Sequence, residues 1–171
     1  GSPPPTKVSM ASTLILLFQR GSKRIQSLKT SGRPRQAGQA VGPLGRHTYV
    51  YREMIDAGVP IMFSSDAPVC DPNPLVGIHA AVTRQRRDGT PEGGWYPDQR
   101  ISVEQAVRGY TTVPSEFYGR SKELGSLSPG KRADMIVLDQ NIFDVDPMRI
   151  HDTRVDMTIF DGKIVYHRNN P

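Results

Sequence analysis

DAGVPIMFSSDAPV, residues 56–69, is the stretch that decides the fold class of this chain. Its apolar run, residues 61–63, is short and uninterrupted by polar residues, which is typical of a strand buried on both faces of a parallel sheet. The run stops at two serines and Asp66, so we expect a carboxylate at the end of a buried strand. Enzymes built on parallel strands often keep catalytic groups at that end. Asp66 is therefore a candidate catalytic residue.

Helices are predicted on both sides of this strand. Residues 49–57 have a helical pattern of apolar side chains that Gly58 ends, just before the strand. After the strand, Asn73 can cap a helix that has Pro74 at its first position. Apolar residues at helical spacing continue this second helix, and we expect Asp88-Gly89 to terminate it.

A third helix is predicted beyond a glycine-rich loop over residues 89–99. Ser102 and Gln105 have the spacing of a capping box in front of apolar residues at helical spacing. Pro114 is expected to close this helix, and residues 115–118 can begin a further short turn. Helix, strand and helix in this order indicate an α/β fold.

From Gly125 onward the pattern becomes that of β-structure. A Pro-Gly turn precedes a compact apolar strand at 135–138. Alternating residues 155–160 and the returning segment 163–167 are joined by Asp161-Gly162, the two-residue signal of a type I′ hairpin. We expect no helix between the strand and the hairpin, and the tail needs partner strands to be stable.

The sequence resembles one protein family in several segments that occur in the same order. They are residues 56–69, NPLVGIHAAVTRQRRDGTPEGGWYPDQRISVEQAVRGYT at 73–111, LGSLSPGKRADMIVLD at 124–139 and TRVDMTIFDGKIVY at 153–166. Together they resemble the C-terminal portion of the metal-dependent amidohydrolase superfamily, and more narrowly amidohydrolase family 3. The resemblance runs from about residue 42 to 169, and we expect it not to cover the first forty residues.

The resemblance implies a fragment of a larger fold. The chain has 171 residues, whereas a complete (β/α)₈ barrel typically needs about 250. Residues 42–123 are expected to form the last strand of a TIM-like barrel with its flanking helices. Residues 124–171 are expected to form part of a small β-sandwich domain. The fold class is therefore α/β, and the chain is interpreted as a C-terminal fragment.

Residues 1–41 are interpreted as a disordered or non-native basic segment. They are rich in Gly, Pro, Ser, Gln and Arg, and residues 1–46 hold eight basic residues and no acidic one. A basic arm for nucleic acid is the alternative, but aromatic residues for base stacking are not interleaved with the basic ones from Arg20 onward. Gly1-Ser2 resembles a cloning scar, and the first residue is not Met, so we expect a processed, engineered or truncated chain. A misjoined reading frame is a further hypothesis.

The resemblance also implies the chemistry. Family members hold one or two divalent metal ions, usually zinc, at the C-terminal ends of the barrel strands. A metal-bound water attacks an amide-type carbon–nitrogen bond other than a peptide bond in a small-molecule substrate. By its position, Asp66 is the carboxylate that binds the metal and moves the proton. Without the resemblance, Asp66 is better interpreted as a turn residue whose side chain accepts backbone N–H bonds.

The other metal ligands of the family are missing from this sequence. They are a His-x-His pair, a bridging lysine or carboxylate and two single histidines, all of which precede the last strand. Upstream of Asp66 the chain has only His47, and it has no His-x-His motif. A zinc site needs three or four protein ligands. We therefore expect this chain alone to lack a complete metal site and to be inactive.

The remaining histidines are assigned structural positions. His47 precedes the helix that leads into the strand and is not expected to be a ligand. His79 lies within the second helix, where packing beside Ile78 or exposure to solvent is expected rather than lining of a pocket. His151 and His167 fall in the β tail and are expected at the surface.

Composition sets further limits. Cys70 is the only cysteine, so no intrachain disulfide can form, and a reducing, cytoplasmic location is expected. Its thiol is interpreted as buried and inert, and Trp95 as either a structural anchor or part of a substrate site. The apolar run 14–18 is too short for a membrane span, so no membrane partner is expected. The oligomeric state stays open.

A second function class is carried beside the hydrolase. The chain can be a non-catalytic remnant or interaction module that folds only with a partner supplying the missing strands. A compact, protease-resistant monomer would argue against an incomplete barrel.

Overall fold

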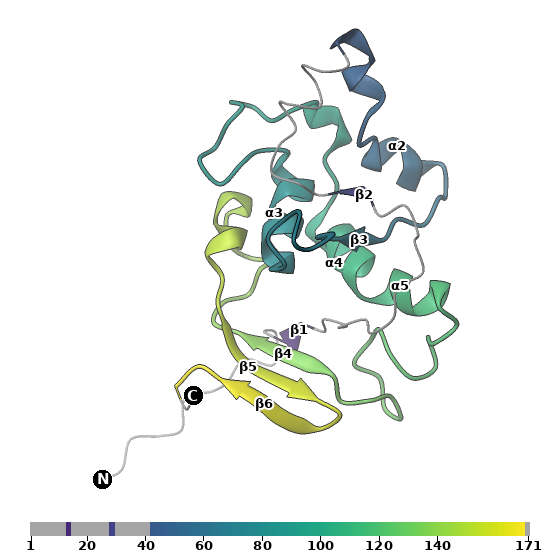
Figure 1. Ribbon diagram of the computed structural model, residues 1–171, viewed down its shortest axis with the longest axis vertical. Coiled ribbons are helices and arrows are strands. Elements are labelled where there is room, and N and C mark those ends of the chain that lie inside the picture. Colours follow the sequence, from purple (N-terminus) through teal and green to yellow (C-terminus); the bar gives the residue numbers. More distant parts are fainter. Residues whose placement is uncertain (1–12, 15–27, 30–41, 170–171) are drawn as a thin grey trace.

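The computed structural model describes residues 13–14, 28–29 and 42–169 (Figure 1). Helical elements and a parallel strand pair form one part, and a twisted sheet forms the other. The elements in chain order are Thr13–Leu14 (β1), Leu28–Lys29 (β2), Gly42–His47 (η2), Tyr51–Asp56 (α2), Phe63–Ser64 (β3), Pro74–Thr83 (α3), Pro97–Gln99 (η3), Val103–Tyr110 (α4), Thr112–Phe117 (α5), Met135–Leu138 (β4), Pro147–Asp152 (η4), Val155–Phe160 (β5) and Lys163–His167 (β6).

The central strand β3 is buried and parallel to its neighbour, as its apolar sequence predicts. It pairs with β2 in the register Leu28 to Phe63 and Lys29 to Ser64. Ile61 and Phe63 are 5% and 6% exposed. The regular strand is shorter than the apolar run and begins only at Phe63. Both β1 and β2 come from residues 1–41, for which we expected no ordered structure, and the rest of that segment lies outside the described residues.

Helix α4 lies directly against β3 because it has a glycine at the contact. A Cβ atom added to Gly109 would come within 2.5 Å of the Phe63 ring and 3.2 Å of the Ile61 carbonyl oxygen. The Phe63 ring also contacts Tyr51 edge-on, with centroids 5.2 Å apart, and Tyr110 at 5.5 Å. Phe63 is therefore enclosed by α2, which precedes it in the sequence, and by α4, which follows it after α3.

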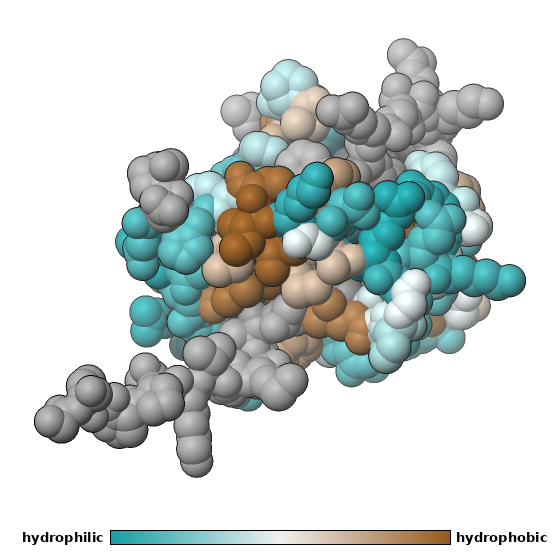
Figure 2. Space-filling view, turned by 90° about the horizontal axis from the view of Figure 1, so that it is seen from below, coloured by the Kyte–Doolittle hydropathy of each residue, from teal (hydrophilic) through white to brown (hydrophobic). Residues whose placement is uncertain are grey.

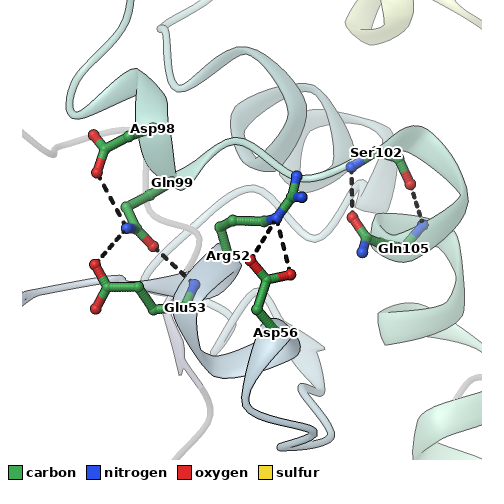
Figure 3. A network of polar contacts seen from close by, with 7 residues as sticks. All are labelled: Arg52, Glu53, Asp56, Asp98, Gln99, Ser102 and Gln105. Atoms are coloured by element: carbon green, nitrogen blue, oxygen red, sulfur yellow. Dashed lines mark hydrogen bonds and ion pairs between the residues drawn. The ribbon is translucent and has the colours of Figure 1, made fainter.

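The capping signals of α3 and α4 are confirmed. The Asn73 side chain accepts a hydrogen bond from the Leu75 amide at 3.0 Å, and Pro74 is the first helical residue. At the start of α4, the Ser102 hydroxyl accepts from the Gln105 amide at 3.0 Å, and the Gln105 side chain accepts from the Ser102 amide at 2.9 Å (Figure 3). Such reciprocal bonds satisfy amide groups that the first helical turn leaves unpaired.

Helix α3 ends at Thr83, earlier than the expected Asp88-Gly89. Arg84 follows in the left-handed conformation, with φ of 60°, and its side chain turns inward. Its guanidinium lies 5.1 Å from the Tyr51 ring centroid and 5.0 Å from that of Trp95, and its Nε donates to the Trp95 carbonyl at 3.0 Å. Burial lowers the pKa of Arg84 and raises that of Tyr51. Contacts with distant aromatic residues thus replace the last helical turn, and Trp95 is a structural anchor.

Helix α4 ends differently from the expectation. It stops at Tyr110, and Pro114 lies inside the next short helix, α5, rather than closing α4. Proline is tolerated there because the first turn of a helix has no intrahelical acceptor for its amide.

Hydrogen bonds between polar side chains connect α2 to η3, the 3₁₀ helix that precedes α4 (Figure 3). The Gln99 amide donates to the Glu53 carboxylate at 2.8 Å, and the Gln99 side-chain oxygen accepts from the Glu53 backbone amide at 3.3 Å. Gln99 is 3% exposed, so these bonds satisfy a polar group inside the protein.

The C-terminal sheet has the order β1-β4-β5-β6 with antiparallel neighbours. Strands β4, β5 and β6 have the predicted bounds. Asp161 and Gly162 have φ of 49° and 76°, the signs that a type I′ turn requires. β1 supplies one partner strand beside β4.

Figure 2 shows apolar side chains gathered on the face seen from below. Ile164 and Val165 of β6 are 61% and 60% exposed.

We expected no helix between β4 and β5, and this expectation is wrong. The 3₁₀ helix η4 lies between them, with Pro147 at its first position and the Asp146 side chain accepting from the Met148 amide at 2.8 Å. Ile150 of η4 is fully buried in the core and η4 packs against α3. Burial of Ile150 makes this segment part of the folded core rather than a plain connection.

Replacing Gly109 with Ala should destabilise the fold by about 1–3 kcal/mol, because the added methyl group overlaps Phe63. Urea unfolding followed by circular dichroism measures the change. Arg108→Ala, at an exposed position of the same helix, is the matched control and should change stability by less than about 0.5 kcal/mol. Equal stabilities of the two variants would contradict the close contact between α4 and β3.

Candidate active site

Asp66 lies two residues after β3, beyond the carboxyl end of the strand, and is exposed. Its φ of 52° places the backbone in the left-handed region. Its amide donates to the Ser64 hydroxyl at 3.2 Å, and its carbonyl oxygen accepts from the Val69 amide at 2.9 Å. The backbone of the residue is therefore fixed on both sides, within the loop that connects β3 to α3.

Asp71 anchors the far end of this loop. Its carboxylate accepts from the Asn73 amide at 2.9 Å and from the Arg87 guanidinium at 2.5 Å. The Asn73 hydrogen bond, followed by the Arg87 contact, lowers the pKa of Asp71. Sequence reasoning assigned the turn role to Asp66 as an alternative and overlooked Asp71. The Asp71-Pro72-Asn73 order, an aspartate two residues before an amide donor, is the signal that could have found it.

The described part of the chain does not by itself fit a metal ion. Within residues 13–14, 28–29 and 42–169, no three or more His, Cys, Asp or Glu side chains gather as a metal-binding group. Zinc requires three or four ligands, and Asp66 could supply one. Cys70, four residues after Asp66, is half-buried and is not part of such a group.

Two histidines that the sequence separates are in contact. His79 of α3 is 1% exposed, so the expected packing within the helix is confirmed. His151 was expected at the surface, which is wrong: it belongs to η4 and its ring packs edge-on against His79, with centroids 4.6 Å apart. The packing of η4 on α3 is the physical reason, since it carries His151 inward. His47 lies exposed in η2, and His167 lies in β6.

None of the helices that the structure describes is long and apolar enough to cross a membrane.

The family comparison matches the amidohydrolase family over residues 24–166. The match starts well before residue 42 and includes β2, so the expectation that the resemblance excludes the first forty residues is wrong. The N-substituted formamide deformylase of Arthrobacter pascens is 35% identical over 117 residues, which are 68% of this chain and 21% of that protein. The chain thus spans about a fifth of the length of this curated relative.

Solved structures support the same fold. An amidohydrolase from Thermotoga maritima MSB8 matches with a TM-score of 0.53 and 22% identity over 71% of this chain and 27% of that chain. A mutant of the atrazine chlorohydrolase TrzN from Arthrobacter aurescens TC1, complexed with zinc and atraton, matches with a TM-score of 0.51 and 24% identity over 70% of this chain and 28% of that chain. The family match covers most of the sequence, and these structures share its α/β arrangement. The chain therefore belongs to the amidohydrolase family, within the family 3 group.

Proposed function

We propose that this chain is the C-terminal part of a metal-dependent amidohydrolase that hydrolyses carbon–nitrogen bonds other than peptide bonds, with Asp66 as its catalytic carboxylate. The position of Asp66 carries the proposal: it lies two residues beyond the carboxyl end of the parallel strand β3, inside the region that the family matches. The named activity of the Arthrobacter pascens relative makes N-substituted formamides the first substrates to test.

The geometry around Asp66 suits proton transfer. A carboxylate at an exposed strand end can accept a proton from water and return it to a leaving amine, provided that both come within hydrogen-bond reach. The bonds of its backbone to Ser64 and Val69 hold the residue in place before substrate arrives. A preformed position lowers the cost of ordering the catalytic group during the reaction.

The metal ligands other than Asp66 would have to come from outside the described residues, which hold no group of three or more such side chains. The chain spans about a fifth of the formamide deformylase, so most of a complete site would belong to the part of that protein that has no counterpart here. We infer that zinc or another divalent metal serves the complete enzyme and that this chain alone does not retain it.

A non-catalytic interaction module is the second candidate. Large apolar side chains are exposed on several elements, which favours a partner: Val69, Phe117, Tyr118, Ile164 and Val165 are 39–61% exposed. Both candidates need a partner that covers these side chains. They differ in whether the assembled complex depends on Asp66 for catalysis.

The isolated chain should bind less than about a tenth of an equivalent of zinc, because a single carboxylate cannot complete a zinc site. Metal analysis of the purified chain after zinc addition and dialysis checks this. Hydrolysis of N-substituted formamides should stay at the level of buffer alone. One equivalent of retained zinc together with turnover would show that the chain contains a complete site.

Co-expression with the upstream part of the Arthrobacter pascens relative should restore hydrolysis. In that complex, Asp66→Asn should lower the rate by about 10²-fold or more, since it removes the proton-accepting group. Glu104→Gln, an exposed carboxylate at the start of α4, is the control and should leave the rate unchanged. A complex that forms but is inactive both with the unaltered chain and with the Asp66→Asn variant would support the interaction module instead.

The backbone of Asp66 makes Asn the suitable substitution for that test. Asn tolerates the left-handed conformation, whereas Ala should cost about 1 kcal/mol more there. Asp66→Ala should therefore unfold at lower urea concentration than Asp66→Asn. Identical unfolding midpoints would mean that the loop does not hold residue 66 at positive φ.

A further inference from the structure

The contact between α3 and η4 contains a buried pair of imidazole rings. His79 and His151 meet edge to face, with an angle of 78° between the ring planes. His79 is 1% exposed, and the side chain of His151 is 15% exposed. Ile78 of α3 and Ile150 of η4, which neighbour the two histidines in sequence, are fully buried in the same core cluster. The rings thus belong to the interior of this contact.

The pair is held by ring packing rather than by hydrogen bonds between the rings. His79 Nε2 and His151 Nδ1 are both buried, and neither has a hydrogen-bond partner among the described residues. His151 Nε2 lies 3.3 Å from the Asp152 carboxylate at the edge of the contact. A neutral ring tolerates such an environment far better than a charged one, because a buried charge without a partner is strongly disfavoured.

The charged groups around His79 favour its neutral form on balance. Arg87, from the segment after α3, and His151, from η4, oppose a positive charge on His79, while Asp152 of η4 favours it. Arg149 of η4 faces Asp152 at 3.9 Å and so offsets part of that attraction. Burial has the largest effect and, with these neighbours, lowers the pKa of His79 to about 4.

We propose that the His79–His151 contact is an acid-sensitive latch, which holds η4 against α3 while His79 is neutral and releases it when His79 takes up a proton. Release would free the connection between β4 and β5, because η4 is that connection. Arg87, whose charge acts on His79, also pairs with Asp71 in the loop of the candidate active site. Acid would therefore loosen the junction between the helical part and the sheet.

The direction of the pH effect follows from proton linkage. The pKa of His79 in the closed state, about 4, lies below its ordinary value of 6.5. Between these values the open or unfolded state binds more protons than the closed state, so stability rises with pH. The contribution of the latch is fully present above about pH 6.5 and is lost progressively as the pH falls towards 4.

Urea unfolding of the full chain between pH 4 and pH 7 tests the latch. The unaltered chain should take up about one more proton on unfolding in this range than His79→Phe, which keeps a ring at the contact but cannot titrate. His167→Phe, on β6 and outside the contact between α3 and η4, is the matched control and should keep the pH dependence of the unaltered chain. Equal pH dependence of the unaltered chain and His79→Phe would overturn the proposal.

Nuclear magnetic resonance of the unaltered chain gives a second measurement, in case His79→Phe does not fold. The ring signals of His79 should shift on acidification, and the cross-peaks between Ile78 and η4 should weaken over the same pH range. Titration of the His79 ring with those cross-peaks unchanged down to pH 4 would refute the release of η4.

Discussion

Burial of Phe63 against Gly109 is the contact on which the rest of this structure depends. The strand that contains Phe63 pairs with β2 on one edge, and α2 and α4 enclose the ring. Because the glycine lets the helix approach so closely, the strand cannot shift without losing the core around it. The direction of β3 then decides where its carboxyl end lies, and with it the position of Asp66. A buried aromatic residue therefore determines the geometry of an exposed carboxylate.

Local signals in the sequence predicted much of the fold correctly. The Asn73 cap, the Ser102 and Gln105 capping box and the Asp161-Gly162 turn all rest on interactions between residues that are close in sequence. Their physical cause lies within the segment itself, so the segment is sufficient to predict them. The strands β4, β5 and β6 followed from the same alternation of residues and turn chemistry.

The errors arose where distant residues decide the local structure. Helix α3 ends at Thr83 because Arg84 turns towards Tyr51 and Trp95, which its own sequence neighbourhood does not reveal. The segment after β4 becomes η4, and His151 moves inward, because the segment packs on α3. In the candidate site, the position of Asp66 after the strand could be predicted from the sequence, and the bond of Asp71 to Asn73 has a local signal, whereas the contact of Asp71 with Arg87, 16 residues away, has none. Such contacts are tertiary, and a pattern within one element carries no record of them.

We propose that Asp66 belongs to a metal site completed by residues outside the described part of this chain. Anomalous X-ray scattering at the zinc edge, measured on crystals of the chain assembled with the upstream part of its formamide deformylase relative, tests this directly. A zinc peak is expected about 2.0–2.2 Å from an Asp66 carboxylate oxygen. A fully occupied zinc ion in that complex with Asp66 beyond coordination distance would contradict it.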